Sequence, residues 1–165
     1  MSESKLKQQV QSMVGEDQDI IPNEFSNLIL DELQIVKLSE ADKAFLEEFT
    51  NLQSLSMNST SLVSLENFPN APKLQKLYLD DNKLKGSDIA QLCASAENLE
   101  VLYVCNNQLK EVEEVTQLAQ LNKLNVLDIS NNEVCNAEGY REKVFEAISS
   151  LEVSIPKKSN SFYLN

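Results

Sequence analysis

The chain has 165 residues, enough for one domain that buries roughly 70% of its unfolded surface. Its 14 basic and 26 acidic residues give a formal net charge of −12, so binding to nucleic acid or to an anionic membrane is electrostatically disfavoured and a basic protein partner is favoured. Three cysteines without metal-ligand spacing, no histidine and no apolar run of membrane-spanning length predict free thiols in the nucleus or cytoplasm and neither metal nor cofactor.

Residues 1–24 are predicted to form an N-terminal helical cap. Leu6, Val10, Met13 and Val14 share one helical face, and Gly15 is placed to end the helix. The first repeat of a solenoid would otherwise expose its apolar edge to water, so a covering helix is expected.

Residues 25–137 contain five copies of one pattern. Its clearest copy, residues 74–84, has leucine at the first, fourth, sixth and eleventh places and asparagine at the ninth, which is typical of a leucine-rich repeat. The copies begin at Phe25, Leu52, Leu74, Leu99 and Leu124. We therefore expect an α/β solenoid, a horseshoe whose concave side is a parallel sheet.

The ninth place is asparagine in the last three repeats, as Asn82, Asn107 and Asn132. Where a strand bends toward the convex side, the backbone loses its ladder partners, and a side-chain amide can both donate and accept in their place. We expect these three residues to form a buried asparagine ladder. Thr60 and Leu33 occupy this place in the second and first repeats, so the first turn must be held in another way.

Residues 138–156 are predicted to cap the C-terminal end, followed by a tail, 157–165, within the same structural domain. The pattern indicates a helix over Glu142–Ser150 that buries Val144, Phe145 and Ile148, with Tyr140 at its entry. Alternating apolar residues over 151–155 favour a last strand. Earlier, between Pro69 and Pro72, a turn or extended segment is expected instead of a helix.

Side chains alternate along a strand, so the third, fifth and seventh places should line the concave face, with the eighth at its rim. Aligned repeats would bring Tyr78 and Tyr103 about 5 Å apart. The candidate partner-binding residues are Asp31, Asn58, Tyr78, Asp80, Asp81, Tyr103, Cys105, Asn106, Asp128 and Asn131.

Two interpretations of this face stay open. The tyrosines and acids resemble the core and rim of an interface for a basic segment. Alternatively, tyrosine merely suits a strand and the acids only keep the protein soluble. Catalysis is not expected, because no histidine or Gly-rich phosphate loop is present and Cys105 has no nearby base in the sequence.

Several blocks resemble the acidic leucine-rich nuclear phosphoprotein family over roughly residues 5 to 153. These blocks are Leu55-Ser-Met-Asn-Ser-Thr60, Leu65-Glu-Asn-Phe-Pro-Asn-Ala-Pro-Lys-Leu-Gln-Lys-Leu77 and the cap motif Tyr140-Arg-Glu-Lys-Val-Phe145. The resemblance implies a protein-binding scaffold in nucleus and cytoplasm, with two partner classes: the catalytic subunit of protein phosphatase 2A, which members inhibit, and histones.

The family's long acidic tail is tied to histone binding, and no acidic run precedes Asn165. This departure favours phosphatase regulation over histone binding. The cap also departs from the family, with Leu151-Glu-Val-Ser-Ile-Pro156 where members usually have Leu-x-x-Leu-Asp-Gly. The alternative is a structural subunit of a ribonucleoprotein or other nuclear assembly that holds a partner helix, as the similar spliceosomal A-prime protein does. In either case we expect a monomer with no direct nucleic-acid or membrane contact.

Overall fold

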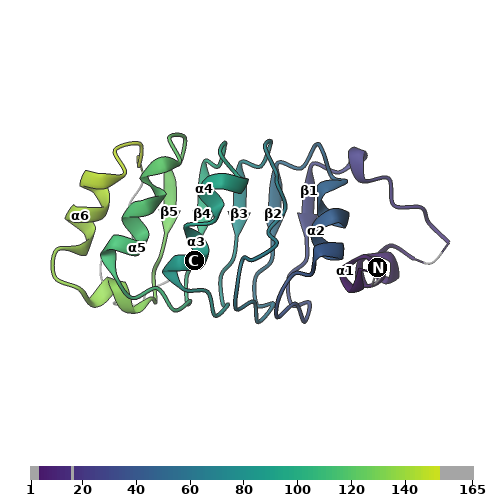
Figure 1. Cartoon of the computed structure of the whole chain (residues 1–165), viewed down its shortest axis with the longest axis horizontal. Coiled ribbons are helices and arrows are strands. Elements are labelled where there is room, and N and C mark those ends of the chain that lie inside the picture. Colours follow the sequence, from purple (N-terminus) through teal and green to yellow (C-terminus); the bar gives the residue numbers. More distant parts are fainter. Residues whose placement is uncertain (1–3, 16, 153–165) are drawn as a thin grey trace, which may run out of the picture.

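The computed structural model describes residues 4–15 and 17–152. Five parallel strands form one sheet whose spatial order is the chain order: β1 (Asn27–Ile29), β2 (Ser54–Ser56), β3 (Lys76–Tyr78), β4 (Val101–Tyr103) and β5 (Val126–Asp128). The strands pair in a constant register: the fourth-place leucines of neighbouring strands are partners, in the order Leu28, Leu55, Leu77, Leu102 and Leu127. The predicted leucine-rich solenoid is therefore confirmed, and Figure 1 shows its strands side by side behind one layer of helices.

The helices cover one face of the sheet. They are α2 (Glu40–Glu47), α3 (Gly86–Ile89), α4 (Leu92–Ser95), α5 (Val112–Thr116) and α6 (Tyr140–Ala147). The described residues also form the 3₁₀ helices η1 (Pro22–Glu24), η2 (Gln117–Gln120) and η3 (Glu133–Asn136). Residues 61–75 of the second repeat contain no helix, as expected from Pro69 and Pro72. The face away from the helices is the concave face.

A continuous apolar core lies between the sheet and the helices. Leu74, Leu77, Leu79 and Leu84 of the third repeat have no exposed surface, and the corresponding leucine or valine positions of the fourth repeat are equally buried. Burying one such side chain contributes about 1.5–3 kcal/mol, so the repeated leucines supply most of the driving force for folding.

Helix α1 (Lys5–Val14) packs against α2 at the N-terminal end of the solenoid (Figure 1). Leu6 and Val10 are buried, but Met13 is 61% exposed, so its expected place in the apolar face was wrong. The stripe that meets the core follows the four-residue spacing Leu6, Val10, Val14. That spacing drifts around a helix of 3.6 residues per turn and leaves Met13 at the margin.

One buried carboxylate joins α1 to α2. Asp42 Oδ1 accepts hydrogen bonds from Ser4 Oγ at 2.8 Å and from the Leu6 amide at 3.1 Å. Its Oδ2 accepts from the Ser39 amide at 2.9 Å and from Ser39 Oγ at 2.7 Å, which closes the capping box of α2. Asp42 therefore caps its own helix and also fixes the start of α1.

The last helix differs from the expected Glu142–Ser150. It begins at Tyr140, because Gly139 takes the left-handed conformation at φ 67° and admits the turn there, and it ends at Ala147. Val144 and Ile148 are buried as expected, and Phe145 is half-buried and packs against the same core. The expected last strand falls mostly on residues 153–155, outside the described part of the chain; Leu151 and Glu152 are not in a strand.

Candidate protein-binding face

Two aromatic rings lie at the centre of the concave face. Tyr78 on β3 pairs in register with Tyr103 on β4, and the rings stack with centroids 5.4 Å apart and planes inclined by 28°. Both side chains are half-buried, so ring surface stays open to solvent. Asp128 is the register partner of Tyr103 on β5, which places a carboxylate in the next position of the same row.

The seventh-place side chains hold one repeat to the next. Asp31 Oδ1 accepts the Asn58 amide at 2.8 Å, Asn58 Oδ1 accepts the Asp80 amide at 2.8 Å, and Asp80 Oδ1 accepts the Cys105 amide at 2.6 Å. Ser56 Oγ also donates to Asp31 Oδ1 at 2.6 Å. The side chains of these three candidate residues therefore connect neighbouring repeats by hydrogen bonds. The sequence did not predict these bonds, because each partner is a backbone amide 22 to 27 positions away.

The eighth-place residues all have a left-handed backbone. Their φ angles are 64° for Glu32, 57° for Ser59, 58° for Asp81, 52° for Asn106 and 58° for Asn131. Asn and Asp tolerate this conformation better than most residues, which is the signal in the sequence that could have revealed it. All five are exposed at the rim, and Asn106 Nδ2 donates to Asp81 Oδ1 at 2.6 Å, so Asp81 and Asn106 act as a pair.

The ninth-place asparagines lie beneath this face. Asn82 Oδ1 accepts from the Leu62 amide, Asn107 Oδ1 from the Leu84 amide and Asn132 Oδ1 from the Leu109 amide, at 2.9–3.0 Å. Each amide nitrogen donates to backbone carbonyls of its own repeat and of the preceding one. In the first turn, which lacks asparagine, the Thr60 carbonyl accepts the Ile35 amide instead. This network fixes the geometry from which the tyrosines and acids project.

The concave face is acidic around the tyrosines. Burial raises the pKa of Asp80, and the nearby charges of Asp128 and Asp81 raise it further, against the lowering effect of hydrogen bonds from Cys105. Burial also raises the pKa of Tyr103, again with Asp128 contributing. Carboxylates that repel one another beside a solvent-exposed tyrosine ring favour the binding of a cation.

Cys105 is expected to be a poor nucleophile. Burial raises the pKa of its thiol to about 12, with hydrogen bonding to Asp128 and the charges of Asp80 and Asp128 adding to the effect of burial. The thiolate, which is the reactive form, is therefore scarce at neutral pH. In the folded protein at pH 8, iodoacetamide should label Cys105 at least tenfold more slowly than a free cysteine peptide; labelling at the peptide's rate would contradict this environment.

Within residues 4–15 and 17–152 no group of three or more cysteine or carboxylate side chains is arranged to hold a metal ion. In the same ranges, no helix has both the length and the apolarity needed to cross a bilayer.

Comparison with protein families matches residues 43–158 to the family described as leucine-rich repeat. The chain belongs to the leucine-rich repeat family. Among curated relatives it is 33% identical to a protein of Tetrahymena thermophila that is named a histone, over 92% of this chain and 39% of the relative. It is 34% identical to "Acidic leucine-rich nuclear phosphoprotein 32 family member A" of Drosophila melanogaster over 64% of this chain and 40% of that relative.

These relatives support the resemblance seen in the sequence, and the chain spans about two fifths of their length. Solved structures share the fold: a chain of the Drosophila melanogaster SNF/U2A′ complex, at TM-score 0.62 and 24% identity, covering 76% of this chain and 69% of that one. An internalin of Listeria monocytogenes has a TM-score of 0.60 at 16% identity over 88% of this chain and 53% of its own. The chain is therefore a protein-binding scaffold of the leucine-rich repeat type.

Proposed function

We propose that the chain is a non-catalytic nuclear scaffold that binds a basic segment of a histone across its concave face. The observation that carries the proposal is the stacked Tyr78–Tyr103 pair with Asp80 and Asp128 beside it. Open tyrosine faces attract cations, and carboxylates form charge-assisted hydrogen bonds with lysine and arginine. The asparagine ladder holds these groups in place, so little ordering is needed on binding.

The names of the curated relatives support a nuclear setting, in which histones are available as basic partners. One relative that aligns with most of this chain is named a histone, and others are named nuclear phosphoproteins. The resemblance also implies the catalytic subunit of protein phosphatase 2A. In our proposal that subunit would be inhibited by occupation of a surface, and the same face would serve both partners.

The affinity of a lysine- and arginine-rich histone peptide tests this proposal. Replacing Tyr78 and Tyr103 together by alanine should weaken binding at least tenfold by calorimetry, because central aromatic residues commonly dominate an interface. The control is a double variant of exposed apolar residues away from the pair, Met13→Ala with Val36→Ala, which should bind as the native chain does. Native affinity in the tyrosine variant, with a native circular dichroism spectrum, would reject the proposal.

Salt separates this proposal from the structural-subunit alternative. A basic segment steered by carboxylates should bind several-fold more weakly at 0.5 M than at 0.1 M salt, because exposed charges are screened. A partner helix held chiefly by apolar contacts would keep its affinity in salt and form a stoichiometric complex on purification. Retained affinity at high salt therefore favours the alternative.

A further inference from the structure

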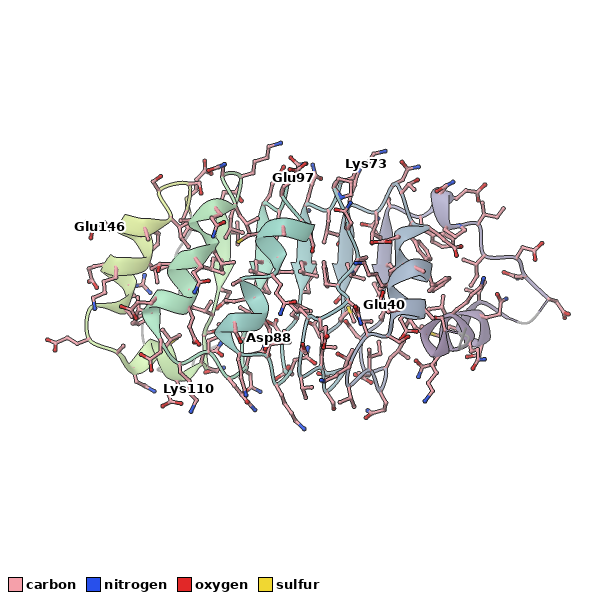
Figure 2. The ribbon with its side chains drawn as sticks, viewed as in Figure 1. Glu40, Lys73, Asp88, Glu97, Lys110 and Glu146 are labelled. Atoms are coloured by element: carbon pink, nitrogen blue, oxygen red, sulfur yellow. The ribbon has the colours of Figure 1, made fainter. Side chains whose placement is uncertain are left out.

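A hollow of about 440 Å³ lies just beyond the turns that follow the strands of the first four repeats. Its lining includes Lys37, Ser64, Lys83, Lys85, Ser87 and Asp88. Figure 2 shows Asp88 and Lys110 toward one long edge of the solenoid and Lys73 and Glu97 at the opposite edge. Neither Tyr78 nor Tyr103 lines the hollow, so it is separate from the tyrosine pair of the concave face.

The three lysines of the hollow have no acidic partner. All three are exposed, and none of them forms an ion pair with the residues in 4–15 and 17–152. Two lysines elsewhere are bound to neutral amides: Lys73 Nζ donates to Asn51 Oδ1 at 2.8 Å and Lys123 Nζ to Asn98 Oδ1 at 2.6 Å. In a chain of net charge −12, the hollow brings three lysines together at one place.

The two carboxylates near the hollow, those of Asp88 and Glu114, each accept hydrogen bonds from backbone amides. Asp88 is only 7% exposed, and its Oδ2 accepts the Lys85 amide at 2.9 Å. Glu114, which packs against Gly86, accepts the Lys110 and Glu111 amides through Oε2 at 3.2 Å. Asp88 keeps its negative charge, but three lysines stand against this one acid in the lining, so the potential of the hollow is locally positive.

We propose that this hollow binds a phosphate monoester carried on serine or threonine of a protein segment. Three ammonium groups around one hollow attract an anion, and a phosphate with close to two negative charges gains more from them than a single carboxylate does. Ser64 Oγ accepts the Glu66 amide at 3.0 Å, so its hydroxyl hydrogen can donate to a phosphate oxygen. The Ser87 hydroxyl offers a second neutral donor at the same lining.

The probe is a short alanine- and glycine-rich phosphoserine peptide, which carries no basic residue for the concave face, measured beside its unphosphorylated twin by calorimetry at low salt. Phosphorylation should strengthen binding at least tenfold. Lys83→Gln with Lys85→Gln should abolish that gain, whereas the matched control Lys73→Gln with Lys123→Gln should keep it. Tyr78→Ala with Tyr103→Ala should also keep it, so this test is independent of the proposed function.

Three outcomes would overturn the proposal. One is equal affinity for the two peptides, and another is an equal loss in the hollow variant and its control. The third is tighter binding of inorganic phosphate or of a single-stranded oligonucleotide than of the phosphopeptide, which would assign the site to a different phosphate source. All lysine variants change exposed side chains, so a native unfolding temperature is expected for each.

Discussion

Replacing Asn82 by alanine is expected to lower the free energy of unfolding by about 3 kcal/mol or more. Asn82 Oδ1 accepts from the Leu62 amide and from Thr60 Oγ1, both at 2.9 Å, and Nδ2 donates to the carbonyls of Met57 and Leu79. Asn82 is 6% exposed, so water cannot easily take its place. Each buried donor or acceptor left unpaired costs about 1–3 kcal/mol.

Urea unfolding measures this effect, and Asn27→Ala is its control. Asn27 is exposed on β1, where its side chain donates to Ser26 Oγ at 3.1 Å, so its loss should change the free energy of unfolding by about 0.5 kcal/mol or less. A loss below about 1 kcal/mol for Asn82→Ala would show that the ladder is dispensable. The concave face would then lack the rigid support that the proposed function relies on.

The second large effect is expected at Asp42, where alanine should cost about 3 kcal/mol at pH 7. The carboxylate is 6% exposed and accepts four hydrogen bonds from Ser4, Leu6 and Ser39. Its removal leaves the starts of α1 and α2 without their shared acceptor. The exposed Asp19→Ala is the matched control and should have almost no effect.

Acid should remove the same contribution. Burial by itself raises the pKa of Asp42, but the hydrogen bonds from Ser39, Ser4 and Leu6 outweigh it and hold the pKa below the ordinary value of 3.8. A carboxyl with a lowered folded-state pKa stabilises fully above its unfolded pKa and loses that effect as the pH falls through the folded value. The stability gap between the native chain and Asp42→Asn should be constant from pH 7 to 5 and shrink below 3.8. A constant gap down to pH 2 would contradict this pKa direction.

The repeat pattern predicted the strands well because leucine spacing and strand alternation are local properties of the sequence. Leu74, Leu77 and Leu79 alone were enough to place β3 and hence the outward direction of Tyr78. The cap helices were less predictable. Helix α6 starts at a left-handed glycine, and the exposure of Met13 depends on how α1 lies against α2.

The hydrogen-bond partners of the Asp80 and Asp42 carboxylates could not be predicted from the repeat pattern. The carboxylate of Asp80 bonds a backbone amide one repeat later, and that of Asp42 reaches a helix 36 residues earlier, so neither partner leaves a local pattern. The Ser39-x-x-Asp42 spacing of a capping box was present, but only the structure shows that the same carboxylate also holds α1. Sequence reasoning therefore located the acidic face and missed how much of it is already bonded.

A basic segment is proposed to bind over Tyr78 and Tyr103 on the concave face. Amide chemical-shift mapping of the labelled chain during titration with a lysine- and arginine-rich histone peptide tests it most directly. The largest shifts should fall on β3 and β4, together with Asp80 and Asp128, and remain small on α2 and α5 of the convex side. Shifts centred on the convex helices, with the tyrosine strands unchanged, would contradict the claim.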